Sequence, residues 1–537
     1  MGQPPNRKGT DMTNVWTRRV KGKAAIAVLV LVALAACTAS KSPAGSSAGD
    51  AAAAPAGGPY AYETPAQSAS QQSSGALKLL KTTPEKGNVG TAFTVTGEGL
   101  PAGREVELVW ATWDGSYVMK PTAETVEFYE RLYEPKRVPF GRATINPDGR
   151  LSATFAAPDD YGEIHDIYAV IDGQDVAKAG FRIVRNVTIT PTEGPVGTPI
   201  TIKVDGLGWK PYEGTLSVLW DNNYSGFISA VATRGNTVGQ IRAAGPIGKH
   251  VIQVGHASAT VPYLNYEQSP VAHIPNFRFE FTVTQDAGAP PPVLDWPLDG
   301  LGTDGVVAAK TTVGSTSATS AAGVSTRISP ASGPILSQTT LQAKDLPAEA
   351  ELNLLWVTAV GNRVSPSGWS LREVPLGKAR TDKNGALEAT VQVPDDLGGW
   401  HSVKLVQNET VLAEVAYFVE RSLVAVTPPR VKAGETFTVQ IKGIGWTELD
   451  NGVAVTYDNA YIGYACGFNS QGDVTMSLVA TGGAGTHLID LYPMIYQGHG
   501  KPPWAYQTSI LSYKQDAPGL ALGYRLPAFR LAITIVE

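Results

Sequence analysis

Residues 437–441 read FTVQI, an alternation of apolar and polar side chains that recurs at 93–96 (FTVT) and 200–204 (ITIKV). Because successive side chains of a β-strand point to opposite faces, each stretch can bury one face and expose the other. Long helical periodicity is absent from the sequence. These stretches therefore predict an all-β chain of half-buried antiparallel strands.

An internal repeat surrounds these stretches. GLGW at 206–209 matches GIGW at 443–446, and His250 matches His487, all at a spacing of 237 residues. The two units within each half also resemble one another, since each opens with a β-rich stretch, a proline and a glycine-containing turn. The order of units is therefore A-B-A′-B′.

The repeat is broken at two places. Trp110 matches Trp356 at a spacing of 246, whereas His165 matches His401 at 236, so the second half lacks ten residues between these points. Near the end of the chain the spacing rises from 237 to 252. This change places a net 15-residue insertion late in the last unit.

A large aromatic residue ends the third predicted strand of every unit: Trp110, Trp220, Trp356 and Tyr457. About seven short strands per ~100 residues, with frequent turns, are typical of immunoglobulin-like sandwiches. The units resemble the bacterial Ig-like, IPT/TIG-type (E-set-like) repeats of surface proteins. The resemblance implies four tandem Ig-like β-sandwich domains, without the cysteine pair of antibody domains.

The predicted segments follow the repeat. They are a signal peptide (1–36), an Ala/Ser/Gly/Pro-rich tether (37–75), domain A (76–185), domain B (186–285), a flexible linker (286–325), domain A′ (326–420) and domain B′ (421–537). No spacer separates A from B in either half, so each pair is expected to form a rigid rod. The linker composition predicts that the two halves move relative to one another.

The N-terminus has the parts of an export signal. A basic stretch precedes an uncharged run at 24–36, whose 13 residues would form a helix of about 20 Å, shorter than the ~30 Å core of a bilayer. The run ends in LAAC at 34–37, which resembles the lipobox of bacterial lipoproteins. The resemblance implies cleavage before Cys37, a lipid on its thiol, and a membrane partner on the outer side of a bacterial membrane.

Composition excludes several classes of function. The net charge is −5 with no basic stripe, so nucleic acid is not an expected partner. Once Cys37 is lipidated, Cys466 is left without a disulfide partner. No catalytic or nucleotide-binding motif is found, and the sequence predicts a non-catalytic chain without a cofactor or metal.

Two recurring features invite a chemical interpretation but favour a structural one. His165, His250, His401 and His487 occupy one position in four successive units, too far apart to share an ion. Each is predicted to pack its ring and bond a loop carbonyl. The pairs at 159–160 and 395–396, both Asp-Asp, are interpreted as turn residues, because neighbouring side chains on a strand point to opposite faces.

The candidate ligand-binding residues lie in the B-type units. They are Asp221, Asn222, Tyr224, Tyr263 and Tyr266 in B, and Asp458, Asn459, Tyr461, Trp504 and Tyr506 in B′. A carboxylate and an amide can fix sugar hydroxyls while aromatic rings stack, and loops at sandwich ends commonly bind ligands. The alternative is that Asp and Asn cap turns and that the loop aromatics pack against the neighbouring A unit.

Three functions stay open from the sequence. The first is a non-catalytic, lipid-anchored cell-envelope protein acting in adhesion, envelope structure or the binding of an extracellular ligand, either a protein or a glycan. The second is a carbohydrate-binding lipoprotein that holds a glycan in the aromatic loops of B and B′. The third is an enzyme of unrecognised type.

Overall fold

The computed structural model describes residues 76–537 except 123, 211, 259, 270, 272, 300–322, 362–367, 468–469 and 500–506. The predicted signal peptide and tether, Cys37, Trp504 and Tyr506 lie outside the described residues. Within the described part, no helix is long and apolar enough to cross a membrane.

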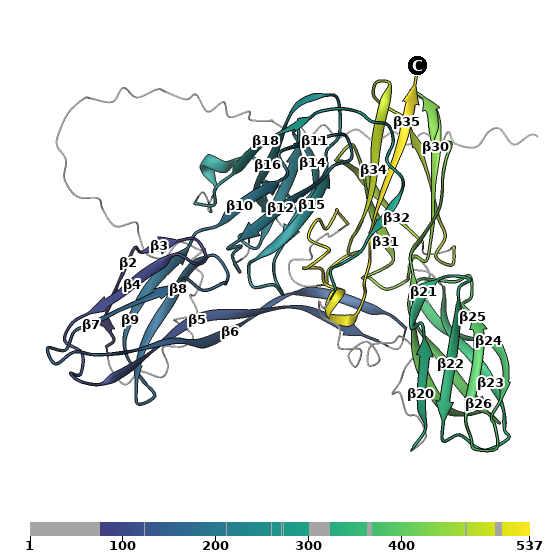
Figure 1. Cartoon of the computed structure of the whole chain (residues 1–537), viewed down its shortest axis with the longest axis horizontal. Coiled ribbons are helices and arrows are strands. Elements are labelled where there is room, and N and C mark those ends of the chain that lie inside the picture. The colour runs from purple at the N-terminus through teal and green to yellow at the C-terminus, as the bar shows by residue number, and fades with distance from the viewer. Residues whose placement is uncertain are drawn as a thin grey trace, which may run out of the picture. The chain divides into compact units, whose positions relative to one another are not determined.

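Domains A and B each consist of two sheets (Figure 1). In A, β2-β4-β7 form one sheet and β1-β9-β8-β5-β6, with β3 beside β9, form the other. Its strands are β1 (Lys78–Leu79), β2 (Lys81–Thr83), β3 (Lys86–Gly87), β4 (Ala92–Gly97), β5 (Glu105–Pro121), β6 (Val126–Thr144), β7 (Leu151–Ala156), β8 (Glu163–Ile171) and β9 (Gln174–Ile183). In B, β10-β12-β15 face β11-β18-β16-β13-β14, with β17 beside β16. Its elements are β10 (Asn186–Thr190), β11 (Glu193–Gly194), β12 (Pro199–Asp205), β13 (Thr215–Trp220), β14 (Asn223–Ser229), β15 (Thr237–Arg242), β16 (Gly248–Ser258), β17 (Val261–Pro262), the 3₁₀ turn η2 (Tyr266–Gln268) and β18 (Phe277–Val283).

Domains A′ and B′ repeat this plan. In A′, β20-β22-β25 face β21-β27-β26-β23-β24. Its strands are β20 (Ser325–Ser329), β21 (Ser332–Pro334), β22 (Gln338–Lys344), β23 (Glu351–Gly361), β24 (Trp369–Arg380), β25 (Leu387–Gln392), β26 (Gly399–Gln407) and β27 (Thr410–Glu420). In B′, β28-β30-β33 face β19-β35-β34-β31-β32, with β29 beside β35. Its elements are β19 (Val293–Asp295), β28 (Ser422–Thr427), β29 (Arg430–Lys432), β30 (Thr436–Lys442), β31 (Gly452–Tyr457), β32 (Ala460–Cys466), β33 (Val474–Val479), β34 (Gly485–Pro493), the 3₁₀ turn η3 (Leu520–Leu522) and β35 (Ala528–Val536).

The predicted all-β, immunoglobulin-like fold class is confirmed. In each domain a small sheet packs on a larger one, and the chain crosses between them, as in the step from β7 to β8 in domain A. The alternating stretches supply the core: Phe93 on β4 stacks on Phe181 of β9 with ring centroids 4.3 Å apart. Burying such apolar faces is the main source of stability for domains that have no disulfide.

The aromatic residue of the third strand and the recurring histidine form one packing device. His165 stacks on Trp110 with centroids 4.6 Å apart, and its ring nitrogens bond the carbonyls of Ala111 and Tyr161. In A′, His401 stacks on Trp356 at 4.4 Å. The corresponding pairs in B and B′ are 4.9 and 5.6 Å apart. The prediction that these histidines pack and bond loop carbonyls is confirmed.

The Asp-Asp pairs need a correction. Asp160 is buried and accepts a hydrogen bond from Trp110 Nε1 at 2.9 Å and another from the Tyr161 amide. Asp396 holds Trp356 Nε1 in the same way, also at 2.9 Å. The second aspartate of each pair is therefore a buried acceptor that fixes the core tryptophan, and not a simple turn residue.

The ten residues that break the first repeat lengthen one hairpin of domain A. Strands β5 and β6 have 17 and 19 residues, against 11 and 12 in β23 and β24, and Figure 1 shows them continuing beyond the rest of their sheet. The outer part of the hairpin bonds domain B′. The Phe128 amide donates to Glu448 at 2.8 Å, and Trp446 Nε1 donates to the Glu124 carbonyl at 2.6 Å.

The insertion of B′ lies between β34 and β35 and contacts domain B. The amide of Phe227 donates to the Ser509 carbonyl at 3.0 Å, and the Leu511 amide donates to the Phe227 carbonyl at 2.9 Å. One hydrophobic cluster includes buried residues of all four domains, among them Phe128, Trp220, Phe418 and Tyr492. The halves thus share a core, which differs from the prediction of two separate rods.

The predicted linker at 286–325 also differs from the structure in its first part. Strand β19 pairs with β35, and Asp286 accepts hydrogen bonds from the amide and hydroxyl of Thr486, both at 2.7 Å. Residues 286–299 are therefore docked on B′, because the strand and the carboxylate satisfy backbone and side-chain donors there. Residues 300–322 of the linker lie outside the described part.

Candidate ligand-binding pocket

The predicted Asp-Asn segments form tight hairpin turns. Asp221 and Asn222 have φ of 48° and 67°, and Asp458 and Asn459 have 47° and 65°, the left-handed pair of a two-residue type I′ turn. Asp221 accepts hydrogen bonds from the Val251 amide and His250 Nδ1, the latter at 2.6 Å. The Asp221 carboxylate thus bonds the recurring histidine of its own domain, B.

The same contact occurs in B′, where Asp458 lies 2.6 Å from His487 Nδ1. Burial opposes protonation of this imidazole, but its hydrogen bonds to Asp458 and the Gly483 carbonyl raise the pKa of His487 above its usual value. The aspartate therefore stabilises the charged histidine and the turn.

Three other candidates lie where B meets B′. The rings of Tyr224 and Tyr461 meet edge to face with centroids 6.3 Å apart, and Tyr461 donates to the Gln507 carbonyl at 2.9 Å. Asn459 is buried and donates to the Arg242 carbonyl of domain B at 2.7 Å. These side chains join B to B′, whereas the packing alternative places the loop aromatics against the neighbouring A unit.

Of the remaining candidates, the structure describes Tyr263 and Tyr266. Tyr263 lies edge to face with His256, 5.5 Å between centroids, and Tyr266 lies in η2. Trp504 and Tyr506 are outside the described residues. The described candidates therefore build turns, an interdomain contact and a surface loop, not one common cavity.

A pocket of about 580 Å³ lies between A′, B′ and the docked segment 286–299, away from the predicted candidates. Its lining includes Trp296, Trp400, Phe418, Asp299, Glu420 and Arg525. Trp400 packs edge to face on Phe418 with centroids 5.1 Å apart and donates its indole N–H to the Leu522 carbonyl at 3.2 Å. Both tryptophans are half-buried, so each keeps part of its ring open to the cavity.

Buried charges next to β19 position Trp296. The preceding residue, Asp295, accepts from Tyr513 OH at 2.5 Å and pairs with Lys514 at 2.6 Å and Arg530 at 3.3 Å. Burial opposes its ionisation, but Arg530, Lys514 and Tyr513 hold the pKa of Asp295 below its usual value. The anchored aspartate fixes where the chain leaves β19 and hence where the tryptophan lies.

The rim of the pocket is charged. Arg525 donates to the Pro297 carbonyl at 3.0 Å and to Asp299 at 2.9 Å, and Glu420 accepts from the Ser332 hydroxyl at 2.7 Å. Aromatic walls with a few polar groups are the usual build of a small-ligand site. Carboxylates and a guanidinium can bond hydroxyls while indole faces cover apolar sugar faces.

The internal repeat supplies a comparison for this pocket. A cavity of about 680 Å³ at the same place in domain A is lined by Glu85, Lys86, Ile164 and Arg182. At spacings of 246 and 236, Ile164 corresponds to Trp400 and Arg182 to Phe418. The two tryptophans are therefore specific to the second half, since Phe181 is the aromatic residue of the domain A lining.

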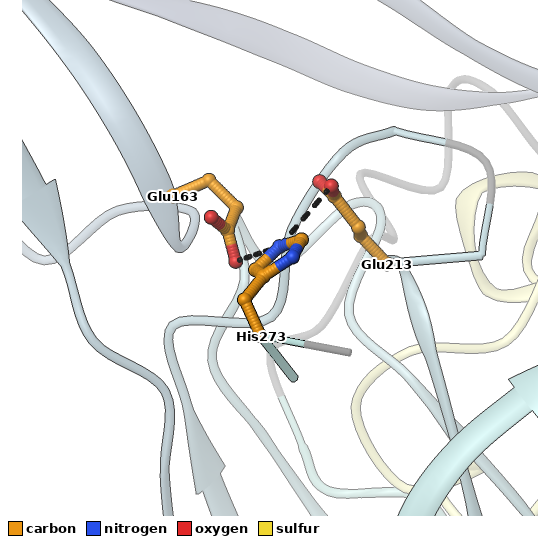
Figure 2. Close-up of side chains that lie close together, drawn as sticks. All are labelled: Glu163, Glu213 and His273. Carbon is orange, nitrogen blue, oxygen red and sulfur yellow. Dashed lines mark ion pairs between the residues drawn. The ribbon is translucent and has the colours of Figure 1, made fainter. Parts of the chain in front are cut away.

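Sequence reasoning missed this site. Trp296 lies in a proline-rich stretch that was assigned to the linker, although the VLDW sequence at 293–296 is unlike the Ser/Thr/Ala/Gly composition that follows it. It also missed Glu163, Glu213 and His273, the three side chains of the described residues that lie close enough to hold a metal ion (Figure 2). They are about 50 to 110 residues apart in sequence, without a ligand-spacing motif.

No protein-family model matches the chain, and no curated protein matches it. Among solved structures, an alpha-2-macroglobulin mutant of Salmonella is 10% identical with a TM-score of 0.16, and the alignment covers 86% of this chain but 30% of that one. The ICAM-5 D1–D4 ectodomain fragment is 10% identical with a TM-score of 0.18, covering 85% and 99%. The D0–D1 domain of intimin is 15% identical with a TM-score of 0.12, covering 31% and 89%. The chain thus spans less than a third of the first of these proteins.

Proposed function

We propose that this chain is a lipid-anchored protein of a bacterial cell envelope, built from IPT/TIG-type, E-set-like repeats, that acts by binding a saccharide rather than by catalysis. The pocket of Trp296 and Trp400 carries the proposal, because it combines two open indole faces with charged groups at its rim. The LAAC sequence at 34–37 and the Ala/Ser/Gly/Pro-rich stretch after it support the anchor and a tether.

Binding fits the lining of the pocket better than catalysis. Among the described residues, the lining includes no histidine, cysteine or lysine. Its two carboxylates are not a free pair, since Asp299 bonds Arg525 and Glu420 bonds Ser332. An acid–base pair poised on either side of a bond would need two carboxylates directed at one substrate atom.

Trp296→Ala is expected to weaken saccharide binding about tenfold or more, because the variant removes a stacking face worth about 1.4 kcal/mol or more. The measurement is a glycan-array screen with the parent chain, followed by calorimetry with the best oligosaccharide. Trp400→Ile, which installs the residue of domain A, is expected to act in the same direction.

Tyr263→Ala serves as the matched control, since it removes a partly exposed aromatic of the B loop. Unchanged affinity in Trp296→Ala, or a parent chain that binds no glycan on the array, would contradict the pocket assignment. Loss of binding in Tyr263→Ala alone would move the site to the loops of B.

Cys37→Ser is expected to abolish incorporation of a labelled fatty acid and to prevent cleavage before residue 37, because the thiol is the acceptor of the lipid. The measurement is metabolic labelling with fractionation and gel mobility. Cys466→Ser, which removes the other cysteine, should leave labelling and membrane retention unchanged. Labelled, membrane-bound protein in the Cys37→Ser variant would show that the anchor lies elsewhere.

A further inference from the structure

Three side chains from two domains converge at the A–B junction. Glu163 lies at the start of β8 in domain A, whereas Glu213 and His273 lie in the loops before β13 and β18 of domain B. Their ligand atoms all lie within 4.8 Å of one another. Figure 2 shows both carboxylates facing the imidazole from opposite sides of the junction.

The spacing of these atoms fits a shared cation better than direct hydrogen bonds. His273 Nε2 is 3.4 Å from Glu163 Oε1 and 3.7 Å from Glu213 Oε1. A charge-assisted hydrogen bond between such groups is normally about 2.7–2.9 Å long. Ligands bound at about 2.0–2.2 Å around a tetrahedral Zn²⁺ are separated by roughly 3.3–3.6 Å. The two distances from His273 therefore lie at or slightly above the edge length of such a tetrahedron.

A buried carboxylate oxygen at this place has no partner. Glu213 is 3% exposed, and its Oε2 accepts no hydrogen bond from any residue that the structure describes. Burial and then the nearby Glu163 raise the pKa of Glu213 to about 7. A buried carboxylate is normally paired with hydrogen-bond donors or with a metal ion. A cation between the two glutamates would give Glu213 Oε2 such a partner.

The second half shows what the junction looks like without these ligands. Arg185 and Arg421 occupy equivalent positions and each donates to a backbone carbonyl, of Glu213 and Asp450 respectively. Asp450, the counterpart of Glu213, instead accepts from the amide and hydroxyl of Thr447, at 2.9 and 2.6 Å. The junction framework is shared, but in the second half one oxygen of its carboxylate is hydrogen-bonded to Thr447.

The other two ligands also differ between the halves. Gly399 of the second half occupies the position of Glu163 in the first half, and both have positive φ, 88° for Gly399 and 79° for Glu163. A side chain in this left-handed region is uncommon outside Asn, Asp and Gly. His273 corresponds to Arg525, which bonds the pocket segment. The first half therefore holds a carboxylate and an imidazole where the second half has neither.

We propose that Glu163, Glu213 and His273 bind a zinc ion that fastens domain A to domain B, with water as the fourth ligand. The imidazole side chain is 38% exposed, so the ion can enter from solvent and the water position is open. The two carboxylates balance the charge of the ion in the presence of the buried Arg185 and of Arg182, which lies 3.9 Å from Glu163. Two glutamates and a histidine are hard and borderline ligands suited to Zn²⁺.

The test uses the full chain, stripped with chelator, titrated with Zn²⁺ by calorimetry and followed by thermal unfolding. One equivalent is expected to bind and to raise the unfolding temperature, since a ligand that binds only the folded state stabilises it. Glu213→Gln and His273→Asn are expected to weaken affinity about 100-fold or more, because even outer-shell partners contribute 10–100-fold. Co²⁺ should give the intense visible absorption of tetrahedral coordination.

His499→Asn is the matched control, because His499 bonds Glu448 at 2.8 Å and lies outside the three-ligand group. Cys466→Ser removes the thiol as a competing ligand. Each control should bind Zn²⁺ like the parent. A parent that takes up no Zn²⁺ at micromolar concentration, or ligand variants that bind it as tightly as the parent does, would overturn the site. So would weak, octahedral cobalt absorption.

Discussion

Asp516→Ala is expected to lower the free energy of unfolding of the joined B and B′ domains by about 3–5 kcal/mol, because it leaves several buried donors without an acceptor. The Asp516 side chain is fully buried. Its oxygens accept from Tyr117 of domain A at 2.6 Å, from Ser229 at 2.8 Å, and from the amides of Val231 and Ala232 at 3.0 and 2.8 Å. One carboxylate therefore ties the long hairpin, domain B and the insertion of B′ together.

The first measurement is unfolding in denaturant. The second is size-exclusion elution of a chain that has been cut at a protease site inserted after residue 312. Parent fragments should elute together after cleavage, because the halves share a core, and the Asp516→Ala fragments should separate at a lower denaturant concentration than the parent fragments do. Asp299→Ala, which removes an exposed carboxylate, is the control and should change stability by less than about 0.5 kcal/mol. Parent halves that part after cleavage would contradict the joined core, and an Asp516→Ala variant as stable as the control would contradict the role of the carboxylate.

The sandwiches were predictable because each strand repeats a local pattern. FTVT at 93–96 and FTVQI at 437–441 alternate with a period of two, and they form β4 and β30 with alternating burial. Trp110 lies 55 residues ahead of His165 and Trp356 lies 45 residues ahead of His401, and the same Trp–His pair stacks in A and in A′. Local periodicity and a fourfold repeat were therefore sufficient to predict the fold class.

The joint between the halves was not predictable in the same way. Its contacts link residues hundreds of positions apart, such as Phe128 with Glu448 and Tyr117 with Asp516. On one side of each of these contacts lies the lengthened hairpin of domain A, and Asp516 lies in the insertion of B′; neither addition has a counterpart in the other half. The two breaks in the repeat spacing were the available evidence for this joint. An extended hairpin and an insertion in a tandem array need a partner surface to bury their apolar residues.

The candidate sites illustrate the same limit. Asp221 and Asn222 recur as Asp458 and Asn459 because both hairpins need a turn with positive φ, so their recurrence reports geometry and not a ligand. The pocket and the glutamate–histidine group use residues that the repeat does not share, such as Trp400 in place of Ile164 and Glu163 in place of Gly399. In a duplicated chain, differences between the copies were the better guide to binding sites.

Asp490→Ala is expected to destabilise the chain by about 3–5 kcal/mol, because it leaves buried guanidinium groups without their shared carboxylate. Asp490 is 2% exposed; it lies 2.5 Å from Arg242 of domain B and 3.2 Å from Arg530. Arg530 keeps Asp295 as a partner, whereas Arg242 retains the Leu531 carbonyl alone among the contacts described. In the Asp490→Ala variant, Arg242 is therefore the guanidinium left without a carboxylate among the contacts described.

Unfolding in denaturant measures this effect, and Gln253→Ala is its matched control, since Gln253 occupies the same position in domain B and bonds the exposed Asn222. The double variant Arg242→Met/Asp490→Leu separates two explanations. If the loss comes from an unpaired buried charge, replacing both partners by apolar side chains should restore most of the stability. If the double variant is as unstable as Asp490→Ala, the ion pair itself, and not the avoidance of a lone charge, joins B to B′.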